Sequence, residues 1–274
     1  MPRVLYIFPM MPYFSILNFE LHTGATLYVL TFLVALIVFI FQLKNDLPVY
    51  QLFLLVFGTS AVALIGARGF HVIFERPELL NNNSVSNLLG LQGLTFYGSF
   101  FAGVLFIYFF NFLVVQSRDI RTKIWNTASI ITAFAYSILR IGCFMNGCCW
   151  GKITPLPWAV TYYAKRTAMP FWGIPVHPVQ IYDAIWGLIT GVLLIITYKK
   201  IIFFKNKLFY LFCLLYSIGR IFTEQFRGDS FRGDKIFLNL STGQLISIVL
   251  FFFALVSLYR MRRNTNLHNQ KAIL

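Results

Sequence analysis

Seven long apolar runs occupy most of this 274-residue chain. Each has about 20 residues, enough for a helix to cross a hydrocarbon core of roughly 30 Å. Hydrophobic residues make up 58% of the chain and charged residues only 12%, a composition that excludes an ordinary soluble domain. The runs span residues 24–43, 51–74, 94–115, 124–146, 178–198, 207–224 and 242–260. The sequence therefore predicts an all-α, polytopic integral membrane protein of about seven transmembrane helices, with residues 1–274 forming one membrane domain.

The lysines and arginines between the runs indicate how the chain crosses the membrane. With the N-terminus outside, the short connections lie in the cytoplasm and hold the basic clusters at 199–207 and 260–263. Short loops rich in lysine and arginine stay in the cytoplasm, so we expect an N-out, C-in orientation. Topology then accounts for much of the net charge of +14, and we expect no nucleic-acid partner.

The connections expected outside are longer than those inside. Residues 147–177 combine prolines with aromatic residues, which favours a folded segment lying on the extracytoplasmic membrane surface. Residues 225–241 contain two Arg-Gly-Asp triplets, which are too short to indicate adhesion. In residues 1–23 we recognise no cleavable signal peptide. The unusual residues gather at the outer ends of the runs, so we expect the working face to be extracytoplasmic.

Three arginines, Arg68, Arg140 and Arg220, lie inside the apolar runs. A charged side chain at bilayer depth costs roughly 2.5–3.5 kcal/mol on insertion scales, so it must face protein, water or a charged ligand. Several such arginines predict a site for an anionic group in the membrane, and the commonest anion there is a lipid phosphate. The alternative for each is an ion pair that locks helix packing, or a side chain that extends to the interface.

Arg220 belongs to a regular pattern with Tyr216 and Glu224. The spacing i, i+4, i+8 places all three on one face of a helix. We expect Arg220 to bind the anion, Glu224 to orient Arg220, and Tyr216 to hydrogen-bond the ligand. A purely structural Arg220–Glu224 ion pair is the open alternative.

Arg140 is followed by a dozen residues rich in glycine and small side chains, among them Asn146 and Gly151. Glycines let backbone approach a ligand closely, and guanidinium groups bind phosphate oxygens in a bidentate manner. This pattern favours phosphate binding by Arg140. Two further polar groups lie at the starts of other apolar runs: Tyr97 with Gly98, and His177 with Gln180. Either group is also explained by a helix cap or an interfacial aromatic belt.

Cys143, Cys148 and Cys149 resemble a metal-binding motif only in composition. A structural zinc site needs four ligands at close spacing, and the interval from Cys143 to Cys148 is too wide. We therefore predict no metal site and treat these cysteines as small buried hydrophobic residues, although the vicinal pair is able to oxidise.

These segments, in this order, resemble the prolipoprotein diacylglyceryl transferase family of bacterial inner-membrane enzymes. The resemblance covers about Gly66 to Ser247. It rests on the following motifs: Gly66-Ala67-Arg68, Gly93-Leu94-Thr95-Phe96-Tyr97-Gly98, Arg140-Ile141-Gly142 with Asn146-Gly147 and Trp150-Gly151, His177-Pro178 with Gln180 and Tyr182, Tyr216 with Gly219-Arg220 and Glu224, and Ser241-Thr242-Gly243-Gln244.

The resemblance implies transfer of the diacylglyceryl group of phosphatidylglycerol to the lipobox cysteine of a prolipoprotein, with release of glycerol 1-phosphate and no cofactor or metal. Its partners would be phosphatidylglycerol, prolipoproteins and membrane lipids, and its location the bacterial cytoplasmic membrane. Arg140, Arg220 and Tyr97 would be catalytic. The substrate-binding residues would be Arg140, Arg220, Tyr216, Glu224, Asn146, Gly98, Gly151, His177, Gln180 and Arg68.

The chain departs from the family pattern at several positions. Tyr97 replaces a histidine that is proposed to help deprotonate the thiol, Cys143 and Cys148 replace polar residues, and Gly24 lies near the place of an expected tyrosine. Two alternatives therefore stay open. One is a divergent paralogue that is inactive or acts on another lipid or acceptor, and the other is a lipid or anion transporter, for which no internal repeat is visible.

Overall fold

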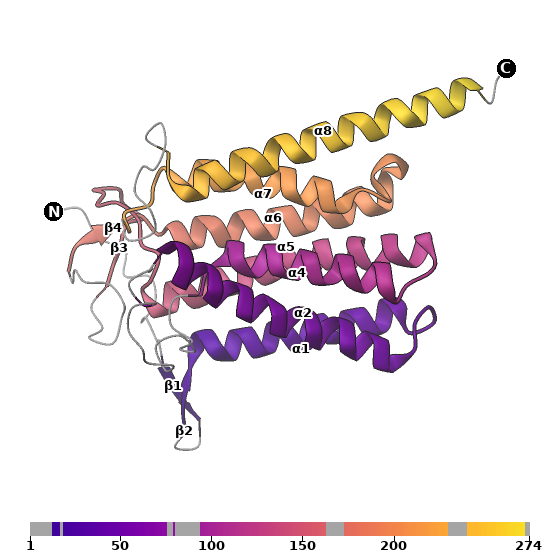
Figure 1. The fold of residues 1–274 in the computed structure, drawn as a ribbon. Helices are drawn as coiled ribbons and strands as arrows, with labels where there is room; N and C mark the ends of the chain where they lie inside the picture. The colour runs from indigo at the N-terminus through magenta and orange to yellow at the C-terminus, as the bar shows by residue number, and fades with distance from the viewer. Residues whose placement is uncertain are drawn as a thin grey trace. The chain divides into compact units, whose positions relative to one another are not determined.

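The computed structural model is mainly helical (Figure 1). It describes residues 13–16, 19–75, 79, 94–162, 173–229 and 240–271. The main helices are α1 (Thr23–Leu43), α2 (Val49–Phe70), α4 (Phe96–Leu113), α5 (Arg118–Asn146), α6 (Val179–Lys200), α7 (Leu208–Glu224) and α8 (Thr242–Lys271). A π-helical turn, η1 (His71–Glu75), continues α2, and a 3-10 turn, η3 (Ile202–Phe204), follows α6.

Each helix coincides with one predicted apolar run, so the helical multi-pass class is confirmed. Six of the described helices are long and apolar enough to cross a membrane, while α7 has 17 residues, or about 25 Å of rise. The largest differences are at two ends, because α5 begins at Arg118 rather than 124 and α8 continues to Lys271 rather than 260. Both extensions are polar, and polar residues prolong a helix without adding to its apolar run.

Two small antiparallel sheets were not predicted. Strands β1 (Tyr13–Ile16) and β2 (Phe19–His22) pair with Tyr13 opposite His22. Strands β3 (Val160–Thr161) and β4 (Pro175–Val176) pair with Val160 opposite Val176. Strands of two to four residues are too short to produce a recognisable alternation of apolar and polar residues. Most of the predicted loop 75–93 and the second Arg-Gly-Asp triplet lie outside the described residues.

The chain divides into two compact units, residues 32–127 and residues 1–31 with 128–274, which we describe separately. In the first, α2 packs along α4 through small residues. A Cβ on Gly66 would lie 2.5 Å from the carbonyl oxygen of Gly98, and one on Gly98 would overlap the backbone of Gly66. Small residues at such a crossing let two helix backbones approach closely, which is the usual basis of helix association in membranes.

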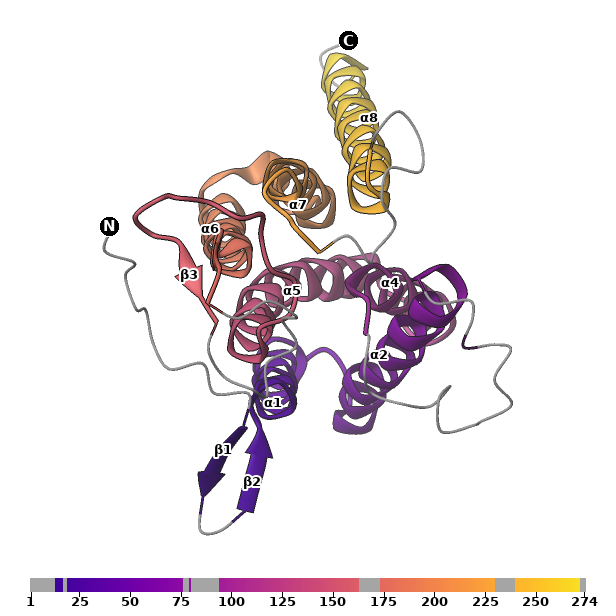
Figure 2. The ribbon, with the colours of Figure 1, turned by 90° about the vertical axis from the view of Figure 1, so that its left-hand side faces the viewer.

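In the second unit, α7 packs against both α6 and α8 and lies between them (Figure 1; Figure 2). Gly219 leaves room for the ring of Trp186, whose Nε1 donates to the carbonyl of Leu215 at 2.8 Å. Gly187 and Gly191, one turn apart on α6, face Tyr136 and Phe134 of α5. The order of packing is therefore α5, α6, α7 and α8.

An extended layer connects the ends of these helices. Residues 150–154 hydrogen-bond on one side to 226–228, through Lys152 N to Phe226 O at 2.8 Å and Gly228 N to Trp150 O at 3.1 Å. On the other side they bond to 175–177, through His177 N to Lys152 O at 3.0 Å. This layer joins the C-terminal ends of α5 and α7 to the N-terminal end of α6, and it places three distant parts of the sequence around one point.

Candidate functional site

The carboxylate of Asp183 on α6 joins two of the embedded arginines. Its Oδ2 lies 3.2 Å from Nε of Arg140 on α5 and 3.2 Å from Nη1 of Arg220 on α7. Its Oδ1 accepts a hydrogen bond from Thr223 at 2.6 Å. Asp183, Arg140 and Arg220 are only 2%, 7% and 6% exposed. Asp183 was not predicted as a site residue, and its only signal in the sequence is a carboxylate within an apolar run.

Arg140 is oriented by two contacts and keeps part of its hydrogen-bonding capacity. Besides Asp183, it lies over the ring of Tyr136, with its guanidinium carbon 4.9 Å from the ring centroid. Among the described residues, Asp183 is its only ion-pair partner, and the bond uses Nε. A guanidinium has five N–H donors in a planar fork. The two terminal NH₂ groups of Arg140 are thus available to an anionic ligand.

The predicted face of α7 is present, and an aromatic contact connects it to Arg140. Arg220 forms an ion pair with Glu224 one turn later. Tyr216, one turn earlier, packs edge-to-face on Tyr136, with ring centroids 5.4 Å apart. Because Tyr136 also lies under Arg140, the predicted residues Arg140, Arg220, Tyr216 and Glu224 belong to one cluster.

Glu224 is held by the start of α8. Its Oε1 accepts a hydrogen bond from Ser241 Oγ at 2.9 Å. Ser241 and Gln244 form a capping box, with Gln244 N donating to Ser241 Oγ at 3.2 Å and Ser241 N donating to Gln244 Oε1 at 3.1 Å. The Ser241–Gln244 motif therefore caps α8 and positions the carboxylate that pairs with Arg220.

A third arginine, Arg227, adds to the cluster and was not predicted. It is 9% exposed, its Nε donates to Asp229 Oδ1 at 2.8 Å, and Nε also lies 3.8 Å from Glu224 Oε2. Burial and the charge of Arg220 lower the pKa of Arg227, but Cys149, Asp229 and Glu224 outweigh them, so its pKa lies above the ordinary value. The first Arg-Gly-Asp triplet is thus an internal ion pair that keeps Arg227 charged.

Gln180 was predicted to bind substrate, and its amide nitrogen has protein partners. Nε2 donates to the carbonyl of Cys148 at 2.7 Å and to the hydroxyl of Tyr162 at 2.9 Å, and the residue is fully buried. Burial raises the pKa of the Tyr162 phenol well above its usual range. These contacts attach the first turn of α6 to the turn after α5. Gln180 therefore supports the backbone beside the arginine cluster.

His177 and Gly151 meet in the extended layer. A Cβ on Gly151 would overlap the backbone and side chain of His177, so only glycine fits there. His177 Nδ1 lies 3.2 Å from the hydroxyl of Tyr182, which also accepts from Trp158 at 2.8 Å. Burial, and then the charge of Lys152, lower the pKa of His177 below its usual value, which favours the neutral imidazole.

Asn146 ends α5 beside Gly24. A Cβ on Gly24 would lie 2.9 Å from Nδ2 of Asn146, so a larger side chain at 24 would displace the amide. Within the described residues, Oδ1 of Asn146 is buried and accepts no hydrogen bond. A buried amide oxygen without a partner is costly in an isolated protein, and a hydroxyl-bearing ligand would satisfy it.

The remaining predicted residues, Arg68, Tyr97 and Gly98, lie in the other unit. Tyr97 is 8% exposed in the first turn of α4, two residues after Thr95, whose hydroxyl donates to the carbonyl of Ala67 at 2.9 Å. Together with the close approach of Gly66 and Gly98, this bond holds residues 66–68 of α2 against residues 95–98 at the start of α4. Arg68 and Tyr97 therefore occupy fixed positions within their own unit.

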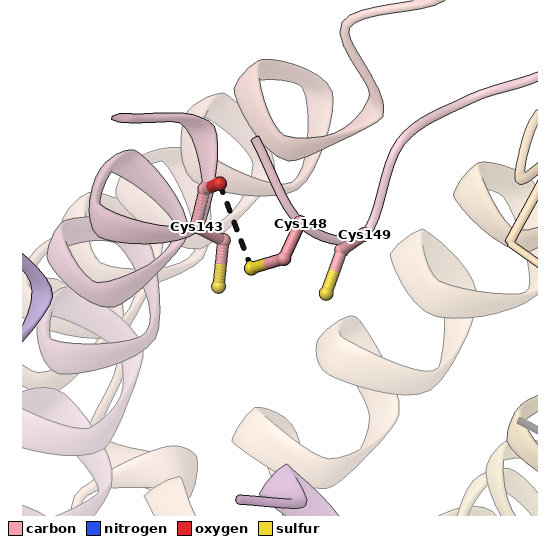
Figure 3. A group of neighbouring side chains, drawn as sticks. All are labelled: Cys143, Cys148 and Cys149. Carbon is pink, nitrogen blue, oxygen red and sulfur yellow. Dashed lines mark hydrogen bonds between the residues drawn. The ribbon is translucent and has the colours of Figure 1, made fainter. Parts of the chain in front are cut away.

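The three cysteines lie closer together than their spacing suggested. The sulfur atoms of Cys143, Cys148 and Cys149 are all within 4.8 Å of one another (Figure 3). The expectation of no metal site used the wide interval between Cys143 and Cys148, and the turn after α5 closes that interval.

Comparison with known proteins gives a consistent result. A family described as prolipoprotein diacylglyceryl transferase matches residues 12–260. A phosphatidylglycerol–prolipoprotein diacylglyceryl transferase of Clostridium tetani is 30% identical over 193 residues, 68% of this chain and 70% of the relative. A protein of the same name from Campylobacter curvus is 25% identical over 92% of this chain and 93% of the relative. Another, from Enterococcus faecalis, is 30% identical over 75% of this chain and 73% of the relative.

Proposed function

This chain belongs to the prolipoprotein diacylglyceryl transferase family, and from that premise we propose that it transfers the diacylglyceryl group of phosphatidylglycerol to the lipobox cysteine of prolipoproteins. The observation that carries the proposal is the convergence of Arg140 and Arg220 on Asp183 inside an apolar helical protein. Charged side chains within membrane helices are costly and usually belong to a functional site. Binding of an anionic lipid headgroup would account for these arginines.

The lipid phosphate would bind to the terminal NH₂ groups of Arg140 and to Arg220. Asp183 pairs with Nε of Arg140, which leaves the two terminal NH₂ groups to bind two phosphate oxygens. Arg220 pairs with Glu224 through Nη2, and Ser241 holds Glu224 by a hydrogen bond. We assign Tyr216 and the unpartnered amide oxygen of Asn146 to contacts with the glycerol headgroup. His177, Gln180 and Gly151 would hold the surrounding backbone.

In the reaction, a sulfur–carbon bond forms between the cysteine and the glyceryl carbon, and the bond from that carbon to the phosphate oxygen breaks. The thiol loses its proton, and the phosphate diester leaves as glycerol 1-phosphate with one additional negative charge. Arginines fixed beforehand around the phosphate stabilise this developing charge without reorganising, which lowers the barrier most in a water-poor site. We assign that role to Arg140 and Arg220.

On the family resemblance, we propose that Tyr97 takes part in removing the thiol proton and that Arg68 and Gly98 bind substrate. Tyrosine loses its proton only near about pH 10 in water, so catalysis through Tyr97 requires nearby cations that stabilise the phenolate. The alternative, that Tyr97 only hydrogen-bonds the substrate, is separated from this role by substitution.

We also propose the membrane arrangement. All seven main helices cross, with α7 the shortest, and the single membrane domain is N-out and C-in because the basic clusters lie near the ends of α6 and α8. The site lies where α5 and α7 end and α6 begins. That end would face the extracytoplasmic side of a bacterial cytoplasmic membrane, with the extended layer on the membrane surface.

The test is mass spectrometry of a lipobox peptide incubated with purified protein and phosphatidylglycerol. We expect a diacylglyceryl mass increase on the cysteine and an equal amount of glycerol 1-phosphate. A peptide with serine in place of the lipobox cysteine should stay unmodified. An unmodified cysteine peptide, from protein that is folded and binds phosphatidylglycerol, would contradict the proposal and direct the search to another acceptor.

A further inference from the structure

The three-cysteine cluster lies beside the proposed site but has no role in it. Cys148 Sγ lies 3.6 Å from the carbonyl oxygen of Cys143, and none of Cys143, Cys148 and Cys149 forms a disulfide (Figure 3). Cys149 is buried, whereas Cys143 and Cys148 are partly exposed. Two of the three cysteines are therefore partly accessible.

The backbone around the cluster is built to bring the sulfurs together. Gly147 ends α5 with φ 66°, and two bonds, Gly147 N to Phe144 O and Cys148 N to Cys143 O, form a Schellman motif. This motif returns Cys148 over Cys143. Cys149 then adopts φ 61°, in the left-handed region that costs a non-glycine residue of order 1–3 kcal/mol. The three sulfur atoms lie next to one another in Figure 3.

The geometry suits three-coordinate binding of one soft ion. With metal–sulfur bonds of about 2.3 Å, three sulfurs around a trigonal centre lie about 4.0 Å apart. The sulfurs here are all within 4.8 Å of one another, so small side-chain rotations suffice. No histidine or carboxylate of the described residues joins the group. Zinc normally requires a fourth ligand, whereas thiolates select soft ions such as Cu(I), which accepts three.

The surrounding charges favour such a complex. Three thiolates around Cu(I) carry a net charge of −2, which is costly to bury alone. Arg140 and Arg227 both lie close enough to Cys149 to interact electrostatically with it. Two guanidinium groups next to the cluster would offset part of its charge.

We propose that Cys143, Cys148 and Cys149 form a binding site for one soft metal ion, with Cu(I) as the best-fitting ion. Binding displaces one proton from each thiol to solvent, and no electron is transferred. The ion would tie the last turn of α5 to the chain that follows it, directly beside Arg140. Neither phosphatidylglycerol nor peptide takes part in this binding, so it can be measured without the transfer reaction.

Competition with bathocuproine disulfonate, a coloured Cu(I) chelator, tests the site on the reduced full-length protein under anaerobic conditions. We expect one Cu(I) to be withdrawn from the chelator per protein. Cys143→Ser, Cys148→Ser and Cys149→Ser should each weaken binding by about 100-fold or more, since even the loss of a supporting contact costs about 10–100-fold at a metal site. The matched control is Cys213→Ser, a buried cysteine within α7, which should bind like the unchanged protein.

X-ray absorption at the copper edge gives a second measurement that needs no variant. We expect sulfur as the main scatterer, with three sulfur neighbours. Absence of binding by the reduced protein, equal binding by Cys143→Ser and the unchanged protein, or a shell dominated by nitrogen and oxygen would each overturn the proposal. A protein that fails to bind Cu(I) but modifies the lipobox peptide leaves the transferase assignment intact, and the converse result contradicts that assignment alone.

Discussion

Arg140 and Arg220, eighty positions apart in the sequence, contact the same oxygen atom, Oδ2 of Asp183, at 3.2 Å each. Two guanidinium groups repel one another, so their approach depends on the carboxylate between them. Asp183 is therefore a positioning residue for both proposed phosphate ligands. Its removal should affect the site in a different way from the removal of either arginine.

Asp183→Asn keeps the size of the side chain and removes the charge. The two arginines should separate, and a misplacement of about 1 Å can cost roughly 100-fold in rate. We expect kcat to fall by about that factor, with a lower melting temperature because breaking a buried ion pair costs about 3–5 kcal/mol. Asp183→Glu should recover part of the rate. Equal activity of the unchanged and Asn proteins would show that the arginines are positioned by other contacts.

Arg140→Lys and Arg220→Lys keep the positive charge and remove the planar fork. Loss of one preorganised donor typically costs about 100–1,000-fold in kcat, so both variants should lose nearly all transfer while still inserting in the membrane. Arg118, exposed at the start of α5, provides the control, and Arg118→Lys should retain full activity. Normal turnover by either site variant would refute its assignment to the lipid phosphate.

Ser241→Ala and Gln244→Ala separate two functions of one motif. Both weaken the α8 cap, by about 1 kcal/mol, but only Ser241 bonds to Glu224. Thermal unfolding should show similar losses of stability, whereas the transfer assay should show a larger loss for Ser241→Ala. Equal losses in both assays would mean that Ser241 acts through the helix cap alone.

Tyr97→Phe removes a hydroxyl and leaves the ring. If Tyr97 takes part in proton removal, the transfer rate should fall with little change in the lipid KM. Tyr97→His should restore or exceed the original rate, because imidazole is largely unprotonated at neutral pH and can accept a proton, whereas a phenol stays protonated. Tyr108, exposed on the same helix, gives the control variant Tyr108→Phe. An unchanged rate for Tyr97→Phe assigns the residue to packing.

Gly151→Ala tests the contact between the extended layer and His177. The added Cβ would overlap His177, and overpacking of this kind typically costs about 1–3 kcal/mol. We expect a lower melting temperature and reduced transfer. Gly69→Ala is the control, since a Cβ there meets nothing within 4 Å. A Gly151→Ala protein as stable as the Gly69→Ala protein would show that the layer adjusts at little cost.

The sequence predicted what depends on local order and missed what depends on contacts between distant segments. Hydrophobic runs located every main helix, and the i, i+4 spacing of Arg220 and Glu224 predicted neighbours that form an ion pair. Asp183 was missed because its role depends on the contact of α6 with Arg140 on α5. Arg227 was missed because its role depends on its approach to Cys149, a residue distant in the sequence.

The cysteines show the same limit at shorter range. Four residues separate Cys143 from Cys148, an interval that we interpreted as too wide for a metal site, but a left-handed glycine and a left-handed Cys149 bring the sulfurs together. Backbone conformations of this kind are not visible as periodicity or composition. The ligand count of a cluster can therefore be read from sequence, whereas its compactness cannot.

The bond from Ser241 to Glu224 has a consequence for how the protein matures in the cell. Every other member of the cluster lies at or before Asp229 in the sequence, yet the group that holds Glu224 belongs to the start of α8. A nascent chain that stops before residue 241 carries all three arginines without this restraint. Enzyme activity should therefore appear only after the last helix has been inserted, which keeps unfinished chains from acting on membrane lipid.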